Sequence, residues 1–157
     1  MNNFEHNLYK TIIDKAESGD PAAMFELATL YDSNAISSNS EDEYINWLIR
    51  FLESDRVSSI IEELDDEEGE LTNDNFDFIN AYQFYPKIIE AGIALGLYFK
   101  NSSSINEVRL SCRAFYYAYL TSRFDYIEID DEGGTTDILS LLSQAKERLI
   151  MLSGGTE

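Results

Sequence analysis

The sequence predicts an all-α fold built from antiparallel helix hairpins. Three observations lead to this prediction: apolar residues recur at helical spacing, one helix end is followed at once by a helix start, and two capping boxes are present. With 157 residues, of which 44% are hydrophobic, the chain can fill one core. We expect about six to seven helices in a single domain at 1–157, with an acidic loop at about 65–75 and an acidic linker at about 124–135.

The clearest local signal is the turn between the first two expected helices, within residues 15–31. Gly19 suits the left-handed position just past a helix C-terminus. Asp20 can cap the next helix, and Pro21 fits its first turn, where no amide donor is missed. Small alanines on both sides would let the two helices lie close together, namely Ala16, Ala23 and Ala28.

Helical patterns also define the first helix and two later helices in the first half of the chain. The first helix is expected at about 3–18, with a stripe formed by Phe4, Leu8, Ile12 and Ala16. A capping box, Ser40 with Glu43, begins a helix in which Trp47 is expected in the core, an exposed binding anchor being the alternative. A short helix at 57–64 would bury Val57, Ile60, Ile61 and Leu64.

The second half begins with an aromatic-rich segment at 75–85 that could form a helix of its own. The next helix, at 86–100, is apolar on most sides, which predicts a central position in the bundle. Its Gly92 and Gly96 would let another helix approach closely. Ser104 and Glu107 form the second capping box. Residues 124–134 break the helical period and suit a short strand or a surface loop equally, and a last helix is expected at about 136–152.

Two segments share a spacing that resembles a known repeat. The pattern Ala16-x-x-Gly19-Asp20-x-x-Ala23-x-x-x-Leu27-Ala28-x-x-Tyr31 resembles the core of a Sel1-like repeat, a relative of the tetratricopeptide repeat. A second copy follows at Ala91-x-x-x-Leu95-Gly96-x-x-Phe99. Ala28 replaces the usual Gly, and the second copy has Pro86 in place of the Gly-Asp turn. The resemblance covers about two helix pairs and implies a short α-solenoid of the kind that serves as an interaction scaffold.

Charge is the strongest compositional feature. Eleven basic and thirty acidic residues give a formal net charge of −19. Such a chain repels nucleic-acid phosphates and anionic lipid headgroups, so we expect it to bind neither nucleic acid nor membranes. A basic protein is the complementary partner. The oligomeric state is left open, and so is the alternative that the acidity serves only solubility.

Fifteen of the thirty acidic residues fall into two clusters, at 62–77 and 125–137, which have aromatic neighbours. Aromatic anchors beside carboxylates are expected on a surface that binds a cationic partner. The candidate partner-binding residues are Glu62, Glu63, Asp65, Asp66, Glu67, Glu68, Glu70, Asp74, Phe76, Asp77, Asp125, Tyr126, Glu128, Asp130, Asp131 and Glu132. The first cluster fails as a calcium loop, because Gly69 occupies a ligand position and Glu70 the place of the required glycine.

The sequence offers little for catalysis. His6 is the only histidine, and Cys112 lies in an apolar stripe where a buried, inert thiol is expected. There is no glycine-rich phosphate loop and no zinc-ligand set, so we expect a non-enzymatic protein without cofactor or metal. A single cysteine and the lack of a secretory or membrane-spanning segment favour a cytoplasmic location.

These features favour an intracellular inhibitor. Small acidic helical proteins of this kind resemble bacterial immunity proteins, which neutralise a toxin, often a nuclease with a basic cleft. The alternative is a general Sel1-like adaptor. A DNA mimic is a further alternative, although the acidic clusters are local rather than regularly spaced, and acid–base catalysis by Asp130 and Asp131 would need a partly dry site.

Overall fold

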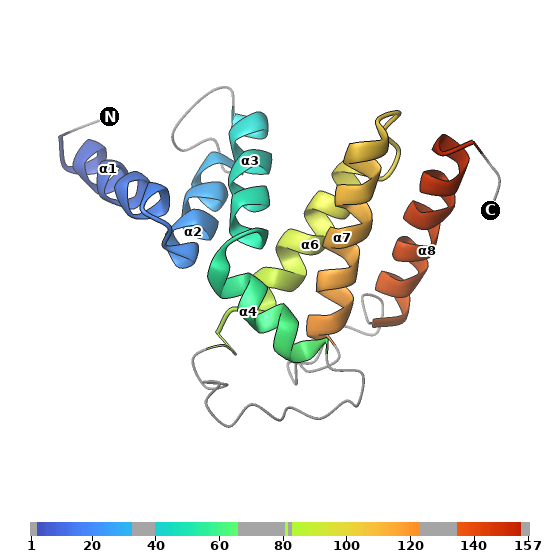
Figure 1. Ribbon diagram of the computed structural model, residues 1–157. Coiled ribbons are helices and arrows are strands. Elements are labelled where there is room, and N and C mark those ends of the chain that lie inside the picture. Colours follow the sequence, from blue (N-terminus) through green and yellow to red (C-terminus); the bar gives the residue numbers. More distant parts are fainter. Residues whose placement is uncertain (1–2, 33–39, 66–80, 82, 123–134, 155–157) are drawn as a thin grey trace. The chain divides into compact units, whose positions relative to one another are not determined.

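The computed structural model describes residues 3–32, 40–65, 81, 83–122 and 135–154 (Figure 1). All regular structure in these ranges is helical, with seven helices and no strand, so the predicted all-α class is confirmed. The helices are α1 Asn3–Glu17, α2 Pro21–Asp32, α3 Ser40–Leu52, α4 Asp55–Leu64, α6 Tyr85–Phe99, α7 Ile105–Ser122 and α8 Thr135–Leu152. They belong to two compact units, Met1–Ser58 and Ser59–Glu157, and each unit is described by itself. Most of the aromatic-rich segment at 75–85 and all of residues 124–134 lie outside the described ranges.

The turn between α1 and α2 has the predicted chemistry. Gly19 has a φ of 107°. Its N–H donates to the carbonyl oxygen of Ala16, and the N–H of Asp20 donates to that of Lys15, both at 3.1 Å. This pair of bonds is the Schellman motif that closes a helix C-terminus. Asp20 then caps α2, because its Oδ1 accepts the N–H of Ala22 at 3.0 Å.

In the first unit, α2 packs against both α1 and α3. The predicted small contacts are confirmed, since Ala16, Ala23 and Ala28 are all buried. The ring centroids of Phe25 and Phe51 lie 5.4 Å apart in a tilted pair. Trp47 is only 6% exposed, with the guanidinium carbon of Arg50 4.0 Å from its ring centroid. Trp47 is therefore a core residue, and its interpretation as an exposed anchor is wrong.

Helix α4 begins at Asp55, two residues before the predicted start. The difference comes from Ser54, whose Oγ accepts the N–H of Val57 at 3.4 Å and donates to the carbonyl oxygen of Phe51 at 2.7 Å. Ser54 thus closes one helix and caps the next. The predicted inward residues Val57, Ile60, Ile61 and Leu64 are all buried.

In the second unit, α7 packs against both α6 and α8 (Figure 1). The prediction for Gly92 and Gly96 is confirmed, and the helix that approaches them is α7. A Cβ at position 92 would lie 2.5 Å from the carbonyl oxygen of Ala114, and one at position 96 would overlap the ring of Phe115. The register is antiparallel, because the earlier glycine faces the later residues of α7. Phe115 also packs with Leu142 and Ala145 of α8, so its ring joins α6, α7 and α8.

The composition of α6 predicts burial on all sides, but the helix is buried on one side only. Leu97 is 50% exposed and Tyr98 is 45% exposed. Its packed face is formed by Ile88, Leu95 and Phe99. The neighbouring helices therefore cover one side of α6 and leave apolar side chains on the other.

The second capping box is present in modified form. The Oγ of Ser104 accepts the N–H of Glu107 at 3.4 Å, as predicted. The Glu107 carboxylate accepts a hydrogen bond from the Ser102 hydroxyl at 2.5 Å, and the Ser104 N–H donates to the Ser102 Oγ at 3.0 Å. Ser102 therefore stands between the two halves of the box. The side chain of Ser40, in the first box, lies outside the described residues.

Candidate functional site

The described part of the predicted partner-binding set lies at the end of α4. Glu62 and Asp65 are exposed, and Glu63 is half-buried. The remaining predicted residues lie outside the described ranges: Asp66, Glu67, Glu68, Glu70, Asp74, Phe76, Asp77, Asp125, Tyr126, Glu128, Asp130, Asp131 and Glu132.

The amphipathic pattern of α4 fixes where its carboxylates lie. Ile60, Ile61 and Leu64 are buried, so this face of the last two turns is committed to the core. Glu62, between two of these positions, and Asp65, just after the helix, are left in solvent. The two exposed carboxylates are three residues apart, close to one helical turn, and therefore mark one edge of the second unit.

An aromatic residue of α7 completes this edge. The hydroxyl of Tyr116 donates a hydrogen bond of 2.6 Å to Oδ1 of Asp65, and the Tyr116 residue is 36% exposed. A bond to an ionised carboxylate is stronger than one between neutral groups. We call Glu62, Asp65 and Tyr116 the acidic edge. Its chemistry suits a lysine or arginine side chain, which could pair with a carboxylate and lie against the ring.

Tyr116 was missed in the sequence. It is 51 residues from Asp65, so no local spacing connects the two. One signal was available: Phe115 and Ala118 belong to the buried face of α7, which directs residue 116 outward. The aromatic neighbours that the sequence predicts, Phe76 and Tyr126, lie inside the acidic segments themselves.

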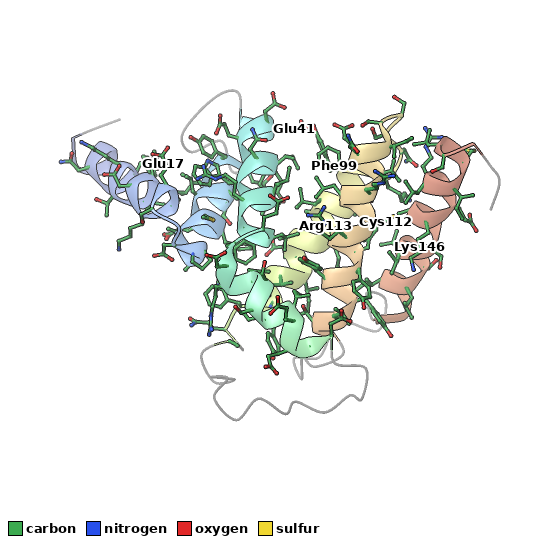
Figure 2. All side chains as sticks on the ribbon, in the orientation of Figure 1. Glu17, Glu41, Phe99, Cys112, Arg113 and Lys146 are labelled. Carbon is green, nitrogen blue, oxygen red and sulfur yellow. The ribbon has the colours of Figure 1, made fainter. Side chains whose placement is uncertain are left out.

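In the first unit, two carboxylates act on Tyr31 of α2: Glu43 in the first turn of α3 and Glu17 at the end of α1. The pKa of the Tyr31 phenol is raised, first by burial and then by the charges of Glu43 and Glu17. Figure 2 labels Glu17 on α1 and Glu41 on α3. The prediction did not include this region, although the acidic run at the start of α3 was visible in the sequence.

Cys112 differs in part from its predicted state. It is half-buried rather than fully buried, and it packs against the cluster of Phe115, Leu142 and Ala145. Burial raises the pKa of its thiol, and the charge of Lys146, on the neighbouring α8 (Figure 2), opposes this only in part. A raised pKa keeps the thiol protonated near neutral pH, which makes it a poor nucleophile.

The described ranges contain no group of three or more histidine, cysteine or carboxylate residues arranged to hold a metal ion. Within the same ranges, no helix combines the length and apolar character needed to cross a membrane. Comparisons of the chain with protein-family models, with curated proteins and with solved structures found no match in any of the three. The resemblance to Sel1-like and tetratricopeptide repeats therefore stays a prediction from residue spacing.

Proposed function

We propose that the chain is a non-enzymatic protein-binding module that inhibits a basic partner, in the manner of an immunity protein or antitoxin. The partner class is a toxin domain such as a nuclease, whose cleft is cationic because it holds phosphate. The observation that carries the proposal is the acidic edge, where the Tyr116 hydroxyl donates to Asp65 beside the exposed Glu62.

Physical arguments favour this kind of partner. The net charge of −19 accelerates encounter with a cationic protein and disfavours anionic ones. Binding energy at protein interfaces is concentrated in a few aromatic and charged residues. The hydrogen bond between Tyr116 and Asp65 holds an aromatic ring and a carboxylate together before any partner arrives, which lowers the ordering cost of binding.

The second candidate is a general adaptor. The helices α1, α2 and α3 pack in sequence, as do α6, α7 and α8, and this consecutive packing favours it. In this proposal the two units correspond to the two repeat echoes of a Sel1-like protein. The adaptor would hold a partner without inhibiting it.

The test compares the full chain with two matched variants as bait in a lysate of its own cells. Glu62→Gln with Asp65→Asn removes two charges from the acidic edge, whereas Glu90→Gln with Glu147→Gln removes two exposed charges from α6 and α8. We expect a basic protein to be captured at low salt, to be lost at high salt, and to be weakened only by the first variant. Equal capture by both variants would contradict the role of the acidic edge.

A functional measurement separates the two candidates. The captured protein is expressed alone and together with the chain, and cell growth is followed. An inhibitor restores growth that the partner alone arrests, and the Glu62→Gln/Asp65→Asn variant restores it less well. A partner that is harmless alone favours the adaptor.

A further inference from the structure

Two cationic side chains of the second unit are held by neutral oxygens where the turn after α6 meets α8. Nζ of Lys100 donates to Oε1 of Gln144 at 2.7 Å. Nε of Arg148 donates to the carbonyl oxygen of Ser102 at 3.1 Å. These acceptors carry no charge, so neither bond neutralises its cation. An ammonium has three donors and a guanidinium five, so both groups keep donors for a further acceptor.

The two bonds run side by side. Gln144 and Arg148 are four residues apart, and therefore neighbours on one face of α8. Lys100 and Ser102 are two residues apart in the turn. Two positive charges brought together in this way disfavour each other and favour an anion that contacts both.

An exposed apolar side chain lies beside Arg148 on α8. Met151, three residues after Arg148 and therefore its neighbour on the helix surface, is 58% exposed. Large exposed apolar side chains next to polar groups are typical of interaction surfaces. Methionine is also a residue type that interfaces favour.

We propose that Lys100 and Arg148 bind a carboxylate of an acidic peptide segment from another protein, and that Met151 receives an apolar side chain next to it. Charge complementarity is the reason for this choice of partner. A guanidinium can hold a carboxylate by two parallel hydrogen bonds, and the ammonium adds a third contact. This surface is separate from the acidic edge and has the opposite charge, so it goes beyond the proposed function.

Neighbouring carboxylates limit which ligands can bind. The Glu107 carboxylate accepts a hydrogen bond from the Ser102 hydroxyl, and Glu147 is exposed on α8. Together with the negative charge of the whole chain, they repel a diffuse anion. Binding must therefore come from short-range, directional contacts and from the apolar contact with Met151. A carboxylate beside an apolar residue meets this requirement.

The same bonds also have a structural role, since they tie α8 to the turn after α6. A purely structural role predicts that their loss lowers stability, with no response to any ligand. A test must therefore measure binding as well as folding.

The experiment uses the full, isotope-labelled chain at low salt and follows backbone amide shifts by NMR. The probe is the blocked tetrapeptide Leu-Glu-Leu-Glu, and the matched probe is Leu-Gln-Leu-Gln. We expect saturable shifts at Lys100, Ser102, Gln144 and Arg148 with the first probe, and binding weaker by about tenfold or more with the second. Equal responses to both probes, or none, would overturn the proposal.

Two variants complete the test. Lys100→Gln with Arg148→Gln should abolish the response, while Lys87→Gln, a cation at the other end of α6 whose Nζ donates to the carbonyl oxygen of Gln83, should leave it unchanged. If circular dichroism shows that the double variant does not fold, Arg148→Lys takes its place. It keeps the charge but loses the two-pronged contact, so the affinity should fall several-fold. Unchanged affinity in the folded Lys100→Gln/Arg148→Gln variant, or in Arg148→Lys, would contradict the assignment.

Discussion

Ser111 on α7 donates a hydrogen bond of 2.7 Å from Oγ to the carbonyl oxygen of Gly96 on α6. Ser111 is fully buried, and an unsatisfied hydroxyl there would cost stability. The bond is possible because Gly96 has no side chain to hold the two backbones apart. One polar contact and two glycines thus fix α6 against α7.

This close approach predicts a steric penalty for alanine at position 92. The added Cβ would lie 2.5 Å from the carbonyl oxygen of Ala114, a backbone atom that can move only with its helix. Overpacking costs about 1–3 kcal/mol, and the better helix propensity of alanine returns about 1 kcal/mol. Because the obstacle is a backbone atom, the steric penalty falls in the upper half of that range, about 2–3 kcal/mol, so we expect Gly92→Ala to lower the free energy of unfolding by about 1–2 kcal/mol in urea titrations. A variant as stable as the parent would show that the helices are not held this closely.

At position 96 the obstacle is a side chain, the ring of Phe115. Gly96→Ala and Phe115→Leu should therefore couple. The double variant should lose less unfolding free energy than the two single variants lose together. Gly92→Ala should gain little from Phe115→Leu, because its nearest obstacle is backbone. Urea unfolding of the single and double variants measures both couplings.

The turn between α1 and α2 predicts two independent losses of stability, one for substitutions at Gly19 and one for substitutions at Asp20. No atom lies within 4 Å of a Cβ built on Gly19, so the cost of Gly19→Ala is conformational, about 1–2 kcal/mol for the left-handed backbone. Gly19→Asn should cost less, because asparagine tolerates this region. Asp20→Ala should cost about 1 kcal/mol of stability, because the helix cap is lost. Asp20→Ser should retain most of the capping stabilisation, because serine also caps helices. Thermal unfolding followed by circular dichroism compares the four variants. Equal melting temperatures for alanine and asparagine at position 19 would count against the conformational explanation.

Cys112 should react slowly with iodoacetamide near neutral pH, because burial raises the pKa of its thiol. The rate should rise with pH later than that of a free cysteine peptide. Lys146→Met removes a charge that favours the thiolate and should slow the reaction further. Lys10→Met, an exposed lysine of α1, serves as the control. A rate above that of the free peptide at pH 7 would mean that the thiol is activated after all.

The raised pKa of the Tyr31 phenol predicts a loss of stability at alkaline pH. Its folded pKa is raised above the ordinary value of 10.0, so its contribution to stability is complete below that value and is lost as the pH rises through the folded pKa. The difference in unfolding free energy between the parent and Tyr31→Phe should therefore change only above pH 10. Glu43→Gln removes one cause of the shift, so the change should become smaller, because the folded pKa then lies closer to the unfolded one. A difference that is constant across the alkaline range would contradict a raised pKa.

The predictions that held depend on short stretches of sequence. The turn at Gly19 and Asp20 is encoded by backbone conformation and by a local side-chain cap, so its hydrogen bonds follow from neighbouring residues. The helix approach at Gly92 and Gly96 follows from their spacing of four. The start of α4 was missed because Ser54 acts on two helices at once, a role that its sequence neighbours do not reveal.

Contacts between distant segments were beyond the sequence. The pair Tyr116 and Asp65 depends on how α7 meets the end of α4. The exposure of Leu97 and Tyr98 depends on how many helices surround α6, which helical periodicity does not specify. Composition identified where acidic residues gather, and among the described residues it led to Glu62, Glu63 and Asp65. It could not identify the aromatic partner that joins them from another helix.

The interlocked packing of α6 and α7 also has a consequence for the order of folding. The two helices are joined by a turn of only five residues, 100–104, so bringing them together costs little loop entropy. Contacts between segments close in sequence form early. Within the second unit we therefore expect the α6–α7 hairpin to assemble before α8 packs, with Phe115 already placed to receive Leu142 when α8 emerges.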